Sequence, residues 1–517
     1  MRVKSSLINI SVGLGNQLII TILSFISRTV FINTLGIEYL GINGLLTNIL
    51  AMLSLAEAGI GSSIMYSLYK PVAENDQNKI NVLMKLYKKA YMIIALVILL
   101  LGLSIMPFLD FFVKGSNVEN IHLIYLIFLL NTVAPYFYIH KNSFLNVCQK
   151  GYLVTGIYSI SSIISVCIKI GILQFTRNYI LYLIIDSIIT IINSIIISII
   201  ANRKYPFLRN KTSDKLDNET TISIIKNIKA IVLQNIGTYL VFGTDNIIIS
   251  SFVSVAAVGL YSNYNMLIEI CRTFINQVFN NIYHSVGNLV AKETKDRVYN
   301  LYKVYRFLNF WLYSFLTIVL AILLEPFISL WLGPKFLMSH SVLAILVICF
   351  YERGMRNSIT TIKTTAGIFY EDRYAPLFQA GINLVFSIVL VKYMGISGVF
   401  LGTLISALAV PFWTTPYFVY KKVFKEPLIK YFINYTYYVV VGLAAFIVTR
   451  MICSFIPSNN LLYIGLSGLV CLIVPNIIYI TIFYKTEEFR YLLVIMKKVF
   501  GSLQIKMNLN KKIRNAG

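Results

Sequence analysis

The chain has 517 residues, of which 57% are apolar and 13% are charged, and its formal net charge is +24. Apolar stretches of about 20 residues recur along it, each long enough to cross a bilayer as a helix. Runs such as YMIIALVILLLGLSIMPF (91–108) do not alternate in polarity, which argues against a β-barrel. The basic residues are dispersed among loops without interleaved aromatic residues, which argues against nucleic-acid binding. The composition therefore predicts an all-α polytopic membrane protein.

Hydropathy predicts about fourteen transmembrane helices. Their approximate centres, in chain order, are Gln17, Ser54, Leu99, Val133, Ser162, Ile189, Thr238, Ile270, Phe315, Arg353, Phe386, Leu404, Val440 and Val470. The first apolar run is too long for a secretory signal and no small-residue cleavage pattern follows it, so we expect it to be retained as a span. Most of the 45 basic residues fall in the two termini and the even-numbered loops, which predicts that both termini are cytoplasmic.

Two segments of the chain recur at one constant distance. YLGINGLLTNILAML (39–53) matches AVGLYSNYNMLIEIC (257–271), and VAENDQNKINVLMKLYKKAY (72–91) matches VAKETKDRVYNLYKVYRFLN (290–309). Both pairs are separated by 218 residues. The repeat predicts two homologous six-helix lobes, followed by two C-terminal helices that have no counterpart in the repeat.

Each predicted lobe has an even number of spans, so we expect the repeats to be parallel, related by an axis along the membrane normal. The predicted divisions are an N-terminal lobe (1–201), a cytoplasmic linker (202–225), a C-terminal lobe (226–422), two additional transmembrane helices (423–485) and a basic cytoplasmic tail (486–517). Duplicated lobes of this kind commonly hold a substrate at their interface and work by alternating access.

Charged residues inside the spans indicate a functional site, because each costs roughly 2.5 to 3.5 kcal/mol to insert. The predicted spans contain six cations, Arg28, Lys169, Arg272, Arg353, Arg356 and Lys363, and roughly four deeply placed acids, Glu57, Asp186, Asp245 and Glu269. Asn276 and Asn280 continue a polar stripe along the eighth span. A cavity lined by such residues would be wet and cationic, suited to an anionic ligand.

Simpler structural roles are open for several of these cations. Glu269 and Arg272 lie three residues apart on one helix and can neutralise each other. Arg353 and Arg356 can instead extend their side chains to a membrane surface. Each of these roles would leave less positive charge for a ligand.

Two of the acids also have structural explanations. Glu57 can pair with a basic residue on a neighbouring helix, and Asp186, alone in its span, is better explained by a structural pairing than by ligand binding. Tyr138 and Asn142 could contact a sugar, but tyrosine is abundant at 35 residues, so this indication is weak.

The sequence lacks the patterns of common catalytic and metal sites. Its six cysteines lie in or beside apolar spans without paired spacing, and no H-E-x-x-H, Walker or G-x-S-x-G pattern occurs. The predicted outward loops are short, whereas a membrane polymerase or glycosyltransferase usually needs a sizeable outer loop. Asp110 and Glu325 are the nearest candidates for its catalytic group, and neither has a partner motif. We therefore expect no metal, no cofactor and no enzymatic activity.

The stretch YLGINGLLTNILAMLSLAEAGIGSSIMYSLYKPVAENDQNKI (39–80) resembles the first hairpin of Wzx-type polysaccharide flippases of the multidrug/oligosaccharidyl-lipid/polysaccharide (MOP) exporter superfamily. Its Leu-Ala-Glu, Gly-Ile and Leu-Tyr-Lys-Pro elements are specific in combination. The resemblance implies a MATE-like fold, with two six-helix lobes around a central cavity. Its implied function is translocation of polyprenyl-pyrophosphate-linked oligosaccharide repeat units across the bacterial cytoplasmic (inner) membrane, for capsule or O-antigen. Its implied partners are membrane lipid, this lipid-linked glycan, a polymerase and other polysaccharide-assembly proteins.

The resemblance also implies roles for the polar residues of the spans. Cations are expected to hold the pyrophosphate and amides the sugars, with Arg28, Arg272, Lys363, Arg356, Lys169, Asn276 and Asn280 as candidates. Cation-coupled relatives imply that an acid binds a proton or a sodium ion, with Glu57, Asp245 and Glu269 as candidates. Related lipid II flippases concentrate arginines in the first lobe, whereas this lobe offers mainly Arg28 and Lys169. Second-lobe cations are therefore expected to hold much of the pyrophosphate.

A cation-coupled multidrug exporter of the same superfamily is the main alternative, because the lobes would be shared. Its site should favour acids and aromatic residues that bind cationic drugs. The surplus of cations in the predicted spans argues against this alternative, and the lack of a catalytic motif argues against a membrane glycan polymerase.

Overall fold

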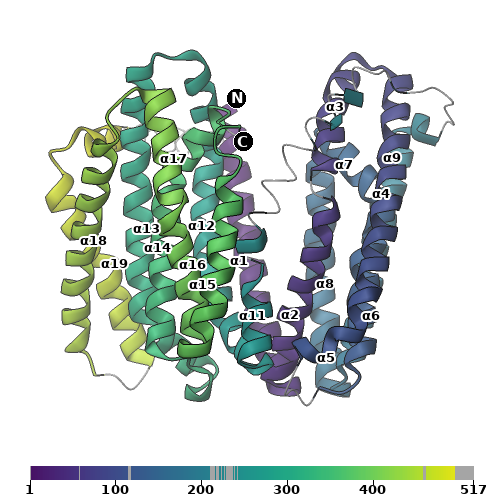
Figure 1. The fold of residues 1–517 in the computed structure, drawn as a ribbon, viewed down its shortest axis with the longest axis horizontal. Helices are drawn as coiled ribbons and strands as arrows, with labels where there is room; N and C mark the ends of the chain where they lie inside the picture. Colours follow the sequence, from purple (N-terminus) through teal and green to yellow (C-terminus); the bar gives the residue numbers. More distant parts are fainter. Residues whose placement is uncertain are drawn as a thin grey trace, which may run out of the picture. The chain divides into compact units, whose positions relative to one another are not determined.

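The computed structural model describes residues 2–57, 59–113, 118–209, 243–368, 370–457 and 461–494, with a few positions between 216 and 241. These residues are helical and include no strand, which confirms the all-α prediction. Nine of the described helices are long and apolar enough to cross a membrane, or ten if the bent pair Ile121–Phe137 and Ile139–Val147 is one span. The chain is therefore a multi-pass membrane protein (Figure 1).

The predicted count of about fourteen spans is not reproduced among the described residues, for physical reasons. Helices α12 (Val255–Lys292) and α14 (His340–Thr365) are long enough to span a bilayer, but they carry several charged side chains and are less apolar. Helix α2 (Ile37–Leu53) is shorter and ends in the 3-10 turn η1 (Ser54–Glu57). The span predicted around Thr238 lies mostly outside the described residues.

The chain forms two compact units. Unit 1 comprises Met1–Met266 and Arg373–Val410, and unit 2 comprises Leu267–Asp372 and Pro411–Gly517. The main helices of unit 1 are α1 (Arg2–Leu35), α2, α3 (Ile60–Glu74), α4 (Gln77–Ile105), α6 (Ile121–Val133), α7 (Ile139–Val147), α8 (Gly151–Thr176), α9 (Tyr179–Lys204), α11 (Asp245–Phe252), α15 (Ala375–Met394) and α16 (Ile396–Ala409). Helix α12 continues from unit 1 into unit 2, which also contains α13 (Lys295–Trp331), α14, α17 (Pro411–Val419), the π-turn η6 (Tyr420–Phe424), α18 (Ile429–Ser454) and α19 (Leu461–Phe483).

Two glycines explain the break between η1 and α3 in unit 1. Gly59 precedes α3 with φ of 80°, a conformation that strains a residue with a Cβ atom. Gly61 lies two residues further on, where an added Cβ would collide with the hydroxyl group of Tyr91. Gly59 therefore permits the turn, and Gly61 permits close packing of α3 on α4.

An aromatic core joins α13, α18 and α19 in unit 2. The ring of Phe310 stacks on that of Tyr438, with centroids 4.5 Å apart, and also contacts Tyr479 and Phe483 of α19. The hydroxyl groups of Ser314 and Tyr479 share a hydrogen bond of 2.6 Å. Figure 1 shows α18 and α19 beside α13. The two C-terminal helices are therefore part of the core of unit 2.

One hydrogen bond occurs at equivalent positions in the two units. Tyr87 of α4 donates to Ser143 of α7 at 2.9 Å, and the hydroxyl groups of Tyr305 in α13 and Thr361 in α14 lie 3.2 Å apart. Tyr305 and Thr361 follow Tyr87 and Ser143 by the same 218 residues that separate the sequence repeats. The homologous lobes thus share a buried contact as well as a sequence pattern.

We expect these two hydrogen bonds to differ in their effect on stability. Tyr87→Phe leaves the buried Ser143 hydroxyl without a partner among the described residues, so it should lower the free energy of unfolding by about 1–3 kcal/mol. Tyr305→Phe should lower it by only about 0.5–1.5 kcal/mol, because Thr361 still donates to a main-chain carbonyl. Unfolding in detergent measures both, with Tyr66→Phe, at a 70% exposed residue, as the control. A larger loss in Tyr305→Phe would contradict this expectation.

Candidate functional site

A cavity of about 510 Å³ lies within unit 1, lined by α2, η1, α6, α8 and α9. Its polar lining residues are Asn43, Thr47, Ser54, Asn131, Thr132, Lys169, Tyr182, Asp186 and Ser187, and its apolar ones are Leu50, Ala51, Ile127, Phe128 and Leu183. The volume is typical of small-molecule binding sites. Of the predicted binding residues, Lys169 contributes to this wall.

Helical spacing explains why polar groups meet at this cavity. Asn43 and Thr47 lie four residues apart in α2, as do Tyr182 and Asp186 in α9, and residues at this spacing share a helix face. Ile188, on the other side of α9, is exposed, as a lipid-facing residue would be. Each helix therefore turns its polar face to the cavity and an apolar face outward.

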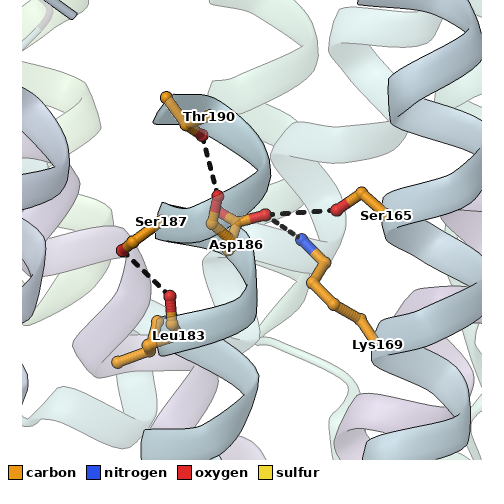
Figure 2. Close-up of polar contacts among 6 residues, drawn as sticks. All are labelled: Ser165, Lys169, Leu183, Asp186, Ser187 and Thr190. Carbon is orange, nitrogen blue, oxygen red and sulfur yellow. Dashed lines mark hydrogen bonds and ion pairs between the residues drawn. The ribbon is translucent and has the colours of Figure 1, made fainter. Parts of the chain in front are cut away.

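An ion pair between Lys169 and Asp186 is the most polar feature of the cavity. Lys169 Nζ lies 2.6 Å from Asp186 Oδ1, and Ser165 Oγ donates to the same oxygen at 3.4 Å (Figure 2). The ammonium group also lies 4.7 Å from the centre of the Tyr182 ring. The Lys169 side chain is 14% exposed and that of Asp186 is 37% exposed. The structural pairing expected of Asp186 is thus present, and it includes a predicted binding residue.

The neutral groups of the cavity offer both donors and acceptors. Asn131 Oδ1 is buried and has no hydrogen-bond partner among the described residues. Buried polar atoms are nearly always hydrogen-bonded in native proteins, so this oxygen is available to a ligand hydroxyl group or to water. The hydroxyl groups of Ser187 and Thr132 already donate to main-chain carbonyls of their own helices, and both keep lone pairs that can accept.

Glu57 has a hydroxyl partner rather than the basic partner considered from the sequence. It ends η1, and its Oε1 accepts a hydrogen bond from the hydroxyl group of the buried Tyr91. The Tyr91 ring lies 5.7 Å from that of Tyr136. Glu57 therefore has a neutral donor, and its turn also supplies Ser54 to the cavity wall.

Arg28, in α1, also has neutral partners. Its Nη1 donates to Ser262 Oγ at 2.8 Å and to Asn263 Oδ1 at 3.5 Å, within the part of α12 that belongs to unit 1. No ion pair between Arg28 and a carboxylate occurs among the described residues. An anion can therefore bind Arg28 without displacing a carboxylate.

Two arginines of unit 2 are paired within their own helices. Arg272 and Glu269 form an ion pair in α12, one of the possibilities left open by the sequence. Arg356 donates to both carboxylate oxygens of Glu352 in α14, at 2.5 and 3.0 Å. The Arg356 side chain is 12% exposed, so it is held inside the unit and does not extend to a membrane surface.

Lys363 of α14 pairs with Asp372, whose side chain is only 4% exposed. Neither Asp372 nor Glu352 was among the acids predicted from the sequence. The spacing of four residues between Glu352 and Arg356 could have shown that pair. The pairing of Lys363 with Asp372 depends on how the chain turns after α14, and no local pattern indicates it. The cation surplus of unit 2 is therefore smaller than the sequence suggested.

The remaining candidates are not gathered at the unit 1 cavity. Asn276 in α12 and Arg353 in α14 are exposed in unit 2, and the side chain of Asn280 lies outside the described residues. Asp110 is exposed in α5 (Leu109–Phe112). Oε2 of Glu325 in α13 lies 2.8 Å from Nδ1 of His340 in α14.

Asp245, at the start of α11, belongs to a buried cluster of oxygen atoms in unit 1. Thr403 Oγ1 lies 3.5 Å from Asp245 Oδ1 and 3.4 Å from the Val399 carbonyl oxygen, and it accepts from Asn383 Nδ2 at 2.9 Å. Asn383 is fully buried, and its Oδ1 has no partner among the described residues. Helices α11, α15 and α16 thus bring together a carboxylate, a hydroxyl group, an amide and a main-chain carbonyl.

The internal repeat, the membrane spans and the polar cavity describe a multi-pass membrane protein with a duplicated sequence. Residues 6–283 match the family described as polysaccharide biosynthesis protein. Because the match covers more than half of the chain, the chain belongs to this family. A search of curated proteins found no match.

Solved structures show the same fold. Lipid II flippase MurJ in an inward closed conformation is 17% identical, with a TM-score of 0.64, over 92% of this chain and 99% of that chain. A mutant of the Vibrio cholerae MATE transporter VcmN is 15% identical, with a TM-score of 0.58, over 82% and 98%. An inward-facing multidrug resistance MATE family transporter of the MOP superfamily is 13% identical, with a TM-score of 0.57, over 76% and 93%.

Family and fold confirm the resemblance to the MOP superfamily. The MATE-like fold is confirmed as well. The chain belongs to a family of polysaccharide biosynthesis proteins and shares its fold with MATE transporters and a lipid II flippase.

We expect Lys169 and Asp186 to be energetically coupled. Lys169→Met should lower the free energy of unfolding by about 1–2 kcal/mol, because it leaves the partly exposed Asp186 carboxylate without its counter-charge. Adding Asp186→Asn should recover part of that loss, with a coupling energy of about 0.5–1.5 kcal/mol. A double-mutant cycle on thermal or denaturant unfolding measures it. Lys392→Met, at an exposed residue of the same unit, should change nothing, and strictly additive losses would show that the pair is uncoupled.

Proposed function

We propose that the protein flips polyprenyl-pyrophosphate-linked oligosaccharide repeat units across the bacterial cytoplasmic membrane, for assembly of a surface polysaccharide such as capsule or O-antigen. Rocking of two lobes would expose the glycan first to the cytoplasm and then to the outer face. The observation that carries this proposal is the unit 1 cavity, whose wall combines neutral hydrogen-bonding groups with Lys169. Membership of a polysaccharide biosynthesis family supports the same substrate class.

The chemistry of the cavity suits a sugar. Sugar hydroxyl groups both donate and accept hydrogen bonds, and amides and hydroxyl groups such as Asn43, Thr47 and Asn131 can do both in return. Phe128 and Tyr182 add aromatic surface against which the apolar face of a sugar ring can pack. A lipid tail needs no protein cavity, because it can stay in the bilayer during translocation.

The partners that each cation already has suggest which cation binds the diphosphate first. Arg28 has neutral partners, so among the described residues the diphosphate would compete with Ser262 and Asn263. Lys169 and Arg272 must each give up a carboxylate to bind it. Breaking such a pair leaves a charge uncompensated and opposes binding. We therefore assign the leading role to Arg28 and a smaller one to second-lobe cations, contrary to the weighting expected from the sequence.

Among the three acids considered for ion coupling, Asp245 has the most suitable surroundings. Its carboxylate lies beside the Thr403 hydroxyl group, which also contacts a main-chain carbonyl and the amide of Asn383, and Asn383 Oδ1 has no partner in the part of the chain that the structure describes. Oxygen ligands of this kind suit a hard cation such as sodium, and a buried carboxylate is also a site for a proton. Glu269 is already neutralised by Arg272, and Glu57 is hydrogen-bonded by a tyrosine hydroxyl group.

Export of cationic drugs is the second candidate, because MATE transporters share the fold. A cationic drug would need a carboxylate in its site. The carboxylate in the unit 1 cavity is that of Asp186, and Lys169 already neutralises it. This pairing favours the glycan over the drug.

A leaflet-translocation assay in proteoliposomes, with fluorescent undecaprenyl-pyrophosphate oligosaccharide, tests the assignment of Arg28. Arg28→Gln should lower the flipping rate about tenfold or more, since a charge-assisted hydrogen bond contributes about 1.5–3 kcal/mol. The paired change Arg272→Gln with Glu269→Gln, which leaves no unpaired charge, should keep the rate within about threefold of the wild type. Lys392→Gln is the matched surface control.

A rate that falls with the Arg272/Glu269 double variant and not with Arg28→Gln would place the diphosphate in unit 2. If the folded wild type flips none of several glycans and instead exports cationic drugs, the multidrug function is supported.

Ion coupling has a separate test in the same assay. The wild-type flipping rate should change when a sodium or proton gradient is imposed, and Asp245→Asn should abolish that response while downhill flipping continues. Glu119→Gln, at an exposed acid of the same unit, should respond like the wild type. A wild-type rate indifferent to both gradients would remove the coupling proposal.

A further inference from the structure

The serine and threonine hydroxyl groups in the wall of the unit 1 cavity already donate their hydrogen atoms. Thr47, Ser54, Thr132 and Ser187 each donate to the main-chain carbonyl four residues earlier, at distances of 2.7 to 3.0 Å. A carbonyl oxygen only accepts, so the direction of these hydrogen bonds is fixed. Toward a ligand, the four hydroxyl groups therefore offer lone pairs rather than hydrogen atoms.

The carboxylate of Asp186 adds a further acceptor to the same wall. Lys169 and Ser165 both donate to its Oδ1, so its Oδ2 can still accept a hydrogen bond (Figure 2). The Asp186 side chain is 37% exposed, whereas that of Lys169 is 14% exposed. A ligand in the cavity therefore meets the carboxylate more readily than the ammonium group.

The amides of the wall do not reverse this excess of acceptors. Asn131 Oδ1 is buried and has no hydrogen-bond partner in the part of the chain that the structure describes. The donors that remain are the amide N–H groups of Asn43 and Asn131 and the hydroxyl group of Tyr182, and all of them are uncharged. Lys169 is the one cation that lines the cavity among the described residues, and it is committed to Asp186.

A wall of this kind distinguishes neutral sugars from acidic ones. Every hydroxyl group of a neutral sugar carries a hydrogen atom that it can donate to these acceptors. An ionised carboxylate has lone pairs alone, and it would leave water for a site whose cation is already paired. It would also be repelled by the charge of Asp186. Neutral sugars therefore match the cavity, whereas uronic acids do not.

Helix α1 indicates which sugar of the glycan reaches this wall. The ring centre of Phe31 lies 5.4 Å from that of Tyr182, which lines the cavity. Arg28 lies three residues before Phe31 in α1, and residues at this spacing share a helix face. A diphosphate held by Arg28 would therefore bring the first sugar of the glycan to the cavity.

We propose that the unit 1 cavity binds the sugar attached to the diphosphate and selects a neutral sugar over one that carries a carboxylate group. Asp186 determines this selectivity, because its Oδ2 accepts a hydrogen bond from a sugar hydroxyl group and its charge repels an anion. The inference rests on the proposed glycan translocation and adds to it the class of sugar that is carried.

The proteoliposome assay tests the selectivity with two fluorescent undecaprenyl-pyrophosphate glycans that differ only in the first sugar, glucose or glucuronate. The wild type should flip the glucose form about tenfold faster or more, because like charges brought together cost several kcal/mol. Asp186→Asn removes the repulsion and leaves Lys169 unpaired, so the glucuronate form should become at least as fast as the glucose form. Glu119→Gln, at an exposed acid of the same unit, should keep the wild-type ratio.

The ratio of the two rates separates sugar selection from a structural role of Asp186. A purely structural carboxylate would lower both rates of Asp186→Asn by the same factor, and this result would overturn the proposal. If Asp186→Asn does not fold, the double variant Lys169→Met with Asp186→Asn replaces it, since it leaves no unpaired charge. Its preference for the glucose form should fall to about threefold or less.

Binding of soluble sugars keeps the selectivity testable without transport. Methyl glucoside should raise the midpoint of thermal unfolding of the wild type in detergent, and methyl glucuronide should not. Equal flipping of both glycans would overturn the selectivity and leave the flippase function standing. If neither glycan is flipped, the proposed function fails, and equal stabilisation by the two soluble sugars would then overturn the selectivity as well.

Discussion

An ionised side chain in the hydrocarbon region loses its hydration, and it is stable there only beside a counter-charge or several hydrogen-bonding groups. This constraint accounts for specific contacts between elements. Lys169 joins α8 to α9 through Asp186, and Lys363 joins the end of α14 to Asp372. A charge that would otherwise oppose insertion thus becomes a specific link between elements. The same link limits transport, because a cation committed to a carboxylate must be released before it can bind a substrate.

The kind of partner separates the cations into two groups. Arg356 is held by both oxygens of Glu352 within one helix, an arrangement that keeps its charge internally balanced. Among the described residues, Arg28 has amide and hydroxyl acceptors, and Arg306 lies beside the rings of Tyr302 and Tyr438. Counting cations along a sequence treats all of these residues as equivalent. Their partners show that most of the positive charge predicted for the unit 2 site is neutralised, whereas Arg28 keeps a charge that a ligand can use.

The features that could be predicted from the sequence are those with local patterns. Hydropathy gives the apolar helices, constant spacing gives the repeat, and a charge inside a span indicates a polar cavity, as at Lys169. The partners of Glu57 and Lys363 could not be predicted, because Tyr91 and Asp372 are brought to them by the packing of helices and by a turn. The pair of Glu352 and Arg356 could have been predicted, since a spacing of four residues places both on one helix face.

The repeat also shows how homologous lobes acquire different properties. Tyr87 with Ser143 and Tyr305 with Thr361 preserve one buried contact in both units, at positions that the repeat makes equivalent. The two units differ in the side chains that surround these helices. Unit 1 leaves a polar cavity among its helices, whereas α18 and α19 fill the α13 side of unit 2 with aromatic side chains. An open polar interior can accept a ligand, while a filled aromatic one resists deformation. The two added helices therefore give unit 2 an aromatic core, whereas unit 1 keeps a polar cavity.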